Sequence, residues 1–154
     1  MPSPSNNAII ESWLESLKDN GYRITTPRRA IVTIIANAPC ALDAIEIYDQ
    51  GRIEHPNLGL VTVYRTLEKL EELDLIQRVH HPDGCNMYIR ASQGHEHLLL
   101  CKSCGQVVFF SGDDLSRLIE ETSRFSGFQI QEHWLQFIGL CANCQSSTSF
   151  GEED

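Results

Sequence analysis

The sequence predicts an α+β protein in two parts: a winged helix-turn-helix domain over residues 1–90 and a small α/β domain over residues 95–146. Three observations support this. Apolar residues recur at helical spacing as far as residue 73, and two short strand-like runs joined by Pro-Asp-Gly follow. Two Cys-x-x-Cys pairs, at 101/104 and 141/144, then bracket a strand-helix-strand pattern. The polar, acidic residues 147–154 are expected to be a disordered tail.

Four amphipathic helices are expected in the first part. The first covers residues 8–20, and Gly21 ends it. Thr26 is the expected N-cap of the second helix, with Pro27 at its first position, and Asp43 is the expected cap of the third. The fourth covers residues 61–76 and turns inward Val63, Leu67, Leu70 and Leu73.

Strands dominate after the fourth helix. Residues 76–81 and 86–91 flank the Pro-Asp-Gly turn and predict the wing. The second part is expected to contain strands over residues 95–101 and 106–110, a helix capped by Asp113 and ended by Gly127, and a long alternating strand over 128–141.

Composition restricts the class of protein. The 154 residues carry a net charge of −9 and contain no apolar run near the roughly 18–20 residues of a membrane helix. The first residues lack the features of a signal peptide, so a cytoplasmic protein that does not enter membranes is expected. Residues 1–90 hold 9 Lys and Arg against 12 Asp and Glu, and the remainder holds 3 against 9. A local basic face in the first part therefore stays possible.

The four paired cysteines predict a zinc site. Thiolates of Cys101, Cys104, Cys141 and Cys144 can close a tetrahedron on one ion per chain, which would join the start of the second domain to its end. Such a closed site is structural, not catalytic. The alternatives are ordinary cysteines or a redox pair.

Three histidines predict a second, regulatory metal site. His95 and His97 are two apart on an expected strand and leave the same face, and His133 lies on the strand that must pack nearby. Imidazoles alone do not select a metal, whereas a thiolate from Cys85 in the wing turn would favour zinc. Cys85 could equally be an unligated turn cysteine. Other residues could complete a regulatory site, and the sequence does not choose among His80, His81, Asp113, Asp114 and Glu120.

The start of the fourth helix has side chains suited to DNA. Thr62, Tyr64 and Arg65 offer a methyl group, a ring and a guanidinium to base edges or phosphates. Arg23 could add a phosphate or minor-groove contact. The alternative is a solvated helix face. Because cations are few, a dimer would be needed to double the contacts.

Together these residues resemble the ferric uptake regulator superfamily of bacterial metal-dependent repressors. The likeness is carried by "YRITTPRR", "LGLVTVYRTLEKLEELDLI", "HEHLLLCKSCGQVVFF" and "FQIQEHWLQFIGLCANC", in the family's order over most of residues 21–144. The resemblance implies a DNA-binding winged-helix domain and a dimerisation domain with a structural zinc at the four cysteines. It also implies a sensing metal that closes a homodimer onto palindromic double-stranded DNA, with Tyr64 and Arg65 as the base-reading pair.

The chain departs from the family at the usual sensor site. Two of that site's histidine positions hold Glu96 and Leu98, and its acidic position holds Phe109. His95, His97 and His133 instead match the family's other site, inside the dimerisation domain, whose acidic ligand would fall at Ser116. With Cys85 on the wing, the likeness is greatest to the zinc uptake regulator branch.

The leading hypothesis is therefore a zinc-sensing repressor of zinc uptake and homeostasis genes, not an enzyme. An iron- or peroxide-responsive regulator of the same superfamily is the alternative. Two further classes are alternatives: a zinc hydrolase, for which no general base stands at a suitable spacing, and a purely structural zinc protein that recruits partners.

Overall fold

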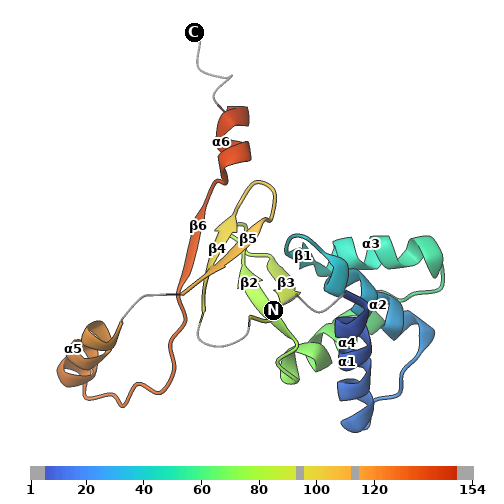
Figure 1. Ribbon diagram of the computed structural model, residues 1–154, viewed down its shortest axis with the longest axis horizontal. Coiled ribbons are helices and arrows are strands. Elements are labelled where there is room, and N and C mark those ends of the chain that lie inside the picture. The colour runs from blue at the N-terminus through green and yellow to red at the C-terminus, as the bar shows by residue number, and fades with distance from the viewer. Residues whose placement is uncertain (1–5, 93–95, 112–114, 149–154) are drawn as a thin grey trace.

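Four helices and a small sheet form the first half of the computed structural model, which describes residues 6–92, 96–111 and 115–148 (Figure 1). Strand β2 pairs with β3 in an antiparallel hairpin, and the short β1 pairs with the other side of β3, so β2 lies at an edge. This confirms the predicted winged helix-turn-helix, to which β1 is an addition. The elements are α1 (Asn6–Asp19), α2 (Thr26–Asn37), β1 (Leu42–Asp43), α3 (Ala44–Glu54), α4 (Leu60–Glu72), β2 (Ile76–His80) and β3 (Asn86–Arg90).

Side-chain caps set the starts of α2 and α3. The Asp43 carboxylate accepts the N–H of Glu46 at 2.8 Å and the Glu46 carboxylate accepts the N–H of Asp43 at 2.8 Å, a complete capping box that confirms Asp43 as the cap. The cap of α2 is Thr25, whose hydroxyl accepts the N–H of Arg28 at 3.4 Å. The prediction of Thr26 was wrong by one residue, because both threonines can cap and Pro27 fits either first-turn position.

Helix α4 ends earlier than the predicted residue 76. Asp74 adopts a left-handed φ of 53°, its N–H donates to Glu71 O at 3.0 Å, and the N–H of Leu75 donates to Leu70 O at 2.9 Å. This is a Schellman motif, which turns the chain out of the helix. Ile76 therefore begins β2 instead of extending α4. Because the apolar residues keep a helical spacing up to Ile76, the spacing alone does not show where the helix ends.

A single apolar core joins the four helices. Each of the four helices contributes buried side chains to this core. Leu73, which was expected to point inward, is only partly buried and packs at the edge of the core. No helix of the described residues has the length and apolar character to cross a membrane. The core centres on Leu17, Ile31, Ile35, Ile47, Val63, Leu67 and Leu70.

The second half contains a three-stranded sheet of order β5-β4-β6. Strand β4 is antiparallel to β5 and parallel to β6. A parallel neighbour needs a long crossover, which here contains α5. The elements are β4 (His97–Cys101), β5 (Val107–Phe110), α5 (Ser116–Ser126), β6 (Gln136–Gly139) and α6 (Ala142–Thr148).

The long strand predicted over residues 128–141 is correct only at its end. Strand β4 has five residues, so a parallel partner can pair over no more than that length, and β6 covers Gln136–Gly139. Residues 128–135 are not a strand, and Phe128 and Trp134 are 74% and 72% exposed. Alternation of apolar residues was a misleading signal there because no neighbouring strand reaches these residues.

The two helices of the second half agree only in part with the prediction. Gly127 ends α5 in the left-handed region, with φ 74°, as predicted, while the expected cap Asp113 lies outside the described residues. Helix α6 was not predicted, and it extends to Thr148, two residues into the expected tail 147–154.

The wing packs against the second sheet instead of standing apart from it. Val79 and Ile89 of the wing share a buried cluster with Leu98 and Leu100 of β4, and Ala41 completes it. The N–H of Ala41 also donates to the carbonyl of Gly105 at 3.0 Å. In Figure 1 the wing accordingly lies between the helices and the second sheet, whereas α5 stands away from both.

We expect Leu67→Ala to lower the free energy of unfolding by about 2–5 kcal/mol, because Leu67 is buried in the helical core and its truncation leaves a cavity. Val61→Ala is the matched control on the same helix: Val61 is 64% exposed, and its truncation should change stability by less than about 0.5 kcal/mol. Urea unfolding followed by circular dichroism measures both. Equal losses would contradict the described orientation of α4.

Candidate metal centre and nucleic-acid interface

Four sulfur atoms meet at one end of the second sheet. The Sγ atoms of Cys101, Cys104, Cys141 and Cys144 all lie within 4.8 Å of one another, and those of Cys104 and Cys141 are 3.8 Å apart. A tetrahedral zinc ion held at about 2.3 Å by four thiolates needs sulfur–sulfur separations of about 3.8 Å. The cluster fits such an ion, and the two Cys-x-x-Cys pairs act together as predicted.

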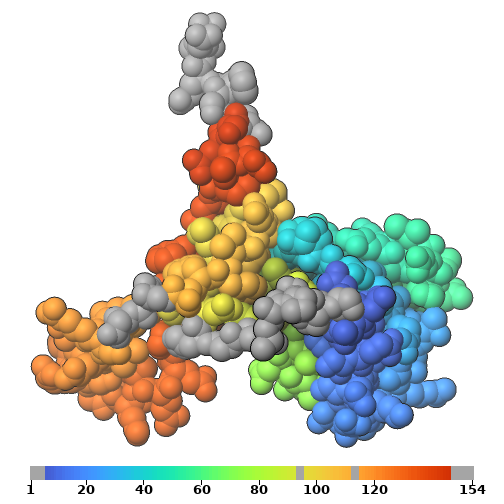
Figure 2. All heavy atoms as spheres, in the orientation of Figure 1, coloured from blue at the N-terminus to red at the C-terminus, as the bar shows by residue number. Residues whose placement is uncertain are grey.

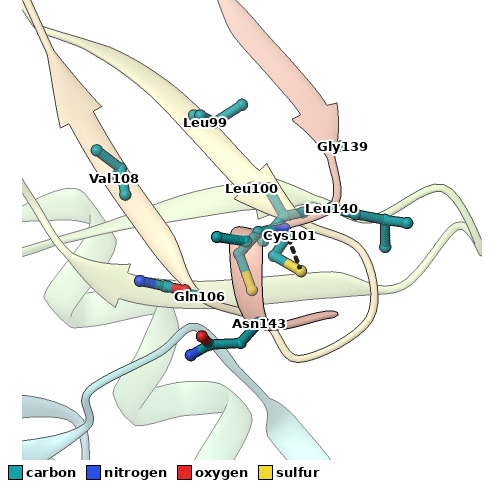
Figure 3. Close-up of a pocket in the computed structure, with 10 residues that line it drawn as sticks. Leu99, Leu100, Cys101, Gln106, Val108, Gly139, Leu140 and Asn143 are labelled. Carbon is teal, nitrogen blue, oxygen red and sulfur yellow. Dashed lines mark hydrogen bonds between the residues drawn. The ribbon is translucent and has the colours of Figure 1, made fainter. Parts of the chain in front are cut away.

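Strand pairing brings the two knuckles together. Cys101 pairs with Gly139 across the parallel β4 and β6 (Figure 3), and Cys141 follows Gly139 by two residues. The N–H of Cys141 donates to Cys101 Sγ at 3.3 Å. In the turn that carries Cys104, the N–H of Cys101 donates to the carbonyl of Gln106 at 2.8 Å. The turn passes through Gly105, whose φ of 73° suits glycine.

The thiols of the cluster differ in acidity. A hydrogen bond from the backbone N–H of Cys141 is the main cause that lowers the pKa of Cys101 to about 6. The backbone of Gln106 lowers the pKa of Cys104, but the adjacent thiols and burial outweigh it and raise that pKa to about 12. Cys101 therefore loses its proton readily, whereas Cys104 keeps a proton that it shares with the neighbouring sulfur atoms. A thiol must lose its proton to bind a metal, so a bound ion would take the place of that proton among the same four sulfur donors.

Four sulfur ligands complete a tetrahedron. No position remains for a water molecule or a substrate, which is the property of a structural and not a catalytic site. An ion bound by the four cysteines would join β4 to α6.

A pair of imidazoles forms a second candidate site. The ring centroids of His97 and His133 are 5.8 Å apart; His97 is buried on β4 and His133 is half-buried just before β6. His97 also lies against Phe110, with ring centroids 5.5 Å apart. The predicted convergence of these two histidines is therefore present, while the third, His95, lies outside the described residues.

Cys85 does not join this pair in the structure. It is exposed in the wing turn, where its carbonyl accepts the N–H of His81 at 3.2 Å. Within residues 6–92, 96–111 and 115–148, the four-cysteine cluster is the one group of three or more potential ligands gathered within 4.8 Å. The expected set of Cys85, His97 and His133 is thus not assembled here.

Most of the other candidate ligands have different partners. His81 uses both ring nitrogens: Nδ1 lies 3.2 Å from the Asp83 carboxylate and Nε2 lies 3.0 Å from the carbonyl of Lys102. Glu120 is paired with Arg124 at 2.8 Å. Asp113 and Asp114 lie outside the described residues. The bond from His81 to the cysteine knuckle joins the wing to the second domain, a role that nothing in the sequence indicates.

Helix α4 presents the residues expected to contact DNA. Tyr64 is 49% exposed and Arg65 is exposed, whereas Thr62 is half-buried and its carbonyl accepts the Thr66 hydroxyl at 2.8 Å. The side chain of Arg65 has no ion pair or hydrogen bond to any described residue. A free guanidinium near the N-terminal end of α4 is available to a base or a phosphate.

The wing adds two side chains to this face that the sequence analysis did not include. Arg78 and Tyr88 stand opposite each other in the hairpin, and the Arg78 guanidinium lies over the Tyr88 ring at 5.9 Å and 2.6 Å from Glu71 of α4. The alternation of the two wing strands could have identified them. Together with α4 they line a hollow of about 340 Å³ formed by Val61, Tyr64, Arg65, Glu68, Arg78 and Tyr88.

Arg23 lies in the loop before α2, and its side chain is exposed. Its backbone carbonyl accepts a hydrogen bond from Arg28 Nη1 at 2.5 Å. Arg28 therefore braces the loop from within, which leaves the guanidinium of Arg23 to face solvent.

Comparison with known proteins finds one family whose model matches residues 19–138, the ferric uptake regulator family. The ferric uptake regulation protein of Bacillus subtilis is 34% identical over an alignment of 139 residues that covers 88% of this chain and 93% of that protein. The zinc uptake regulation protein of Mycobacterium tuberculosis is 32% identical over 126 residues, 82% of this chain and 97% of that protein. The peroxide operon regulator of B. subtilis is 30% identical over 135 residues, 88% and 92% of the two chains.

Solved structures of this kind share the fold. A zinc uptake regulator complexed with zinc and DNA superposes with a TM-score of 0.72 at 20% identity, covering 96% of this chain and 99% of that one. The ferric uptake regulator of Vibrio cholerae gives a TM-score of 0.63 at 30% identity, covering 82% and 98% of the two chains.

We expect Cys104→Ser to lose the metal held by the cysteine cluster, because a serine hydroxyl stays protonated at neutral pH and is a poor ligand for zinc. Cys40→Ser is the matched control, since Cys40 is a half-buried cysteine outside the cluster. Metal content per chain after dialysis, measured by inductively coupled plasma mass spectrometry, distinguishes the two. The same metal content in both variants would show that the cluster is not the site.

Proposed function

Because the chain belongs to the ferric uptake regulator family, whose members are metal-responsive regulators of transcription, we propose that it is a zinc-dependent repressor that binds palindromic operators as a homodimer. The observation that carries the proposal is the presence of two unlike metal-binding arrangements in one half of the chain. One is the four-sulfur cluster and the other is the neighbouring pair His97 and His133. The first suits a permanent ion and the second an exchangeable one.

DNA binding is assigned to α4 and the wing. Exposed Tyr64 and Arg65 would meet base edges in the major groove, while Thr62 at the helix start and Arg23 before α2 would contact the backbone or the neighbouring groove. The hairpin supports this face, since Arg78 is held by Glu71 against Tyr88.

Exposed apolar side chains support a homodimer. Helix α5 buries no side chain, and Figure 2 shows it protruding from the second sheet. Several large apolar side chains left exposed on one half of a chain are typical of an interface. The exposed residues are Leu99, Val108, Leu118, Phe125, Phe128, Phe137 and Ile138. A two-fold dimer presents two copies of α4, which matches a palindromic duplex and doubles the few cationic contacts.

Zinc is proposed as the sensed metal on the basis of ligand chemistry. His97 and His133 would supply two ligands, His95 is placed by the sequence to supply a third, and a thiolate from Cys85 would favour zinc. A bound ion would supply positive charge and fixed coordination directions, and these would hold the segments that carry its ligands in one arrangement. A cytoplasmic regulator of zinc uptake and homeostasis genes follows from this assignment.

An iron- or peroxide-responsive regulator is the second candidate. Relatives named for iron, zinc and peroxide are similar to this chain at 34%, 32% and 30% identity, so similarity alone favours none of them. The exposed position of Cys85, away from the histidine pair, favours this alternative, because a site without a thiolate suits iron equally well.

Metal titration tests the proposed function. Zn²⁺ or Fe²⁺ would be added to dialysed protein that retains the cysteine-bound metal, and the affinity for a duplex selected from a random library would be followed by fluorescence anisotropy. Zinc is expected to raise the affinity at least tenfold. Activation by Fe²⁺ and not by Zn²⁺ would establish the second candidate instead.

The histidine pair is tested by His133→Ala. This variant should keep the cysteine-bound metal, bind one metal fewer per chain and lose the metal-dependent gain in duplex affinity, because one of the proposed ligands is gone. His55→Ala, at the end of α3, is the control and should behave like the wild-type chain. Retention of the full metal content by His133→Ala would contradict the assignment.

Arg65→Ala is expected to weaken duplex binding by about 1–3 kcal/mol, the contribution of one good base contact, without changing metal content. Lys18→Ala removes the same charge from the exposed end of α1 and should have a much smaller effect. If both substitutions weaken binding equally, Arg65 contributes only its charge.

A further inference from the structure

Residues 133–136, which lead into β6, contact both His97 and the wing. His133 faces His97, with ring centroids 5.8 Å apart. The next residue, Trp134, lies edge-on against the ring of His80, with centroids 5.6 Å apart and planes at 71°. Gln136, two residues further, also reaches His80. In an extended chain alternate side chains point to opposite sides, so one short segment contacts the second sheet on one side and the wing on the other.

Gln136 makes two hydrogen bonds with the backbone of His80. Its Oε1 accepts the N–H of His80 at 3.2 Å and its Nε2 donates to the carbonyl of His80 at 2.6 Å. Strand β2 lies at one edge of the order β1-β3-β2, so the outward N–H and carbonyl of His80 have no strand partner. The side-chain amide therefore substitutes for a strand and satisfies an edge that would otherwise be open.

We propose that Gln136 is the positioning residue through which the histidine pair controls the wing: metal at His97 and His133 fixes the segment 133–136 and so holds the Gln136 amide on the edge of β2. The inference rests on the proposed regulatory site. The backbone restricts Gln136 further, because the N–H of Leu98 donates to the carbonyl of Leu135 at 3.1 Å and Leu98 pairs with Gln136. With His133 held as well, the segment has little freedom left.

Contacts within the wing extend the effect to the DNA-binding face. His80 and Arg78 are both on β2, and Arg78 is 2.6 Å from Glu71 of α4. A wing fixed by Gln136 therefore fixes α4, which carries Tyr64 and Arg65. A second contact, from His81 to the carbonyl of Lys102, ties the wing to the cysteine knuckle and does not involve the histidine pair. Besides the buried apolar cluster, the wing thus has one polar attachment that is independent of the histidine pair and, in this proposal, one that depends on the regulatory metal.

The test compares the full-length wild-type chain with Gln136→Ala, Gln136→Glu and Gln131→Ala. Gln136→Glu keeps the size of the side chain but replaces the donating nitrogen with an oxygen that faces the carbonyl of His80. Gln131 is exposed two residues before that segment and has no hydrogen bond to any described residue, so its substitution is the matched control. Cysteine-bound metal content and circular dichroism establish that each variant is folded.

Two quantities are measured with and without added Zn²⁺: hydrogen exchange of a peptide covering residues 74–82, and affinity for the selected duplex. In the wild-type chain and Gln131→Ala, zinc should slow exchange of the wing and strengthen duplex binding. In both Gln136 variants zinc should still bind in the same amount, but exchange should not slow and duplex affinity should fall roughly tenfold, the effect of losing two net hydrogen bonds.

The outcomes separate the two proposals. If zinc slows exchange in Gln136→Ala and Gln136→Glu as much as in the wild-type chain, the role of Gln136 is overturned and the proposed function stands. If zinc strengthens duplex binding of the wild-type chain but leaves hydrogen exchange of its wing unchanged, the role of Gln136 is likewise overturned and the proposed function stands. If zinc does not strengthen duplex binding of the wild-type chain, the proposed function fails and the role of Gln136 fails with it.

Discussion

The parallel pairing of β4 with β6 is the interaction on which both candidate metal sites depend. At one end it places Gly139 opposite Cys101, and so brings Cys141 and Cys144 to the first knuckle. At the other end it places Gln136 opposite Leu98, and so brings His133 near His97. Ligands almost forty residues apart in the chain meet because one four-residue register is maintained. A shift of that register by one residue would turn the side chains of β6 to the other face and dismantle both sites at once.

The same sheet also supports the DNA-binding half. Leu98 and Leu100 face the wing and form a buried cluster with Val79, Ile89 and Ala41, while Leu99 between them faces outward and is 42% exposed. One side of β4 therefore packs against the wing, and the other side carries the exposed Leu99 between the buried His97 and Cys101. The polar contacts of His81, Ala41 and Gln136 surround the shared apolar cluster and give the two halves a defined relative orientation.

Local patterns in the sequence were sufficient for much of this arrangement. Helical spacing, the Asp43 cap and the Pro-Asp-Gly turn predict the winged helix, and two Cys-x-x-Cys pairs predict the four-sulfur cluster, because each signal lies within a few residues. What sequence could not supply depends on distant partners. The length of β6 is limited by β4, the choice between Thr25 and Thr26 depends on backbone angles, and the contacts of His81 and Gln136 arise only when the two halves pack. Arg65 could be recognised by its position on α4, whereas Arg78 acquires its role from Glu71 and Tyr88.

The Schellman turn at Asp74 has a mechanical consequence. Only three residues, 73–75, separate the last residue of α4 from the first residue of β2. Hydrogen bonds from the N–H groups of Asp74 and Leu75 to carbonyls of the helix restrict this connection. Helix α4 and the hairpin are consequently coupled directly, so a change in the orientation of one would change the orientation of the other. With α4 in the proposed DNA-binding role, substitutions on its exposed face would change base preference while the connection that positions it stays the same.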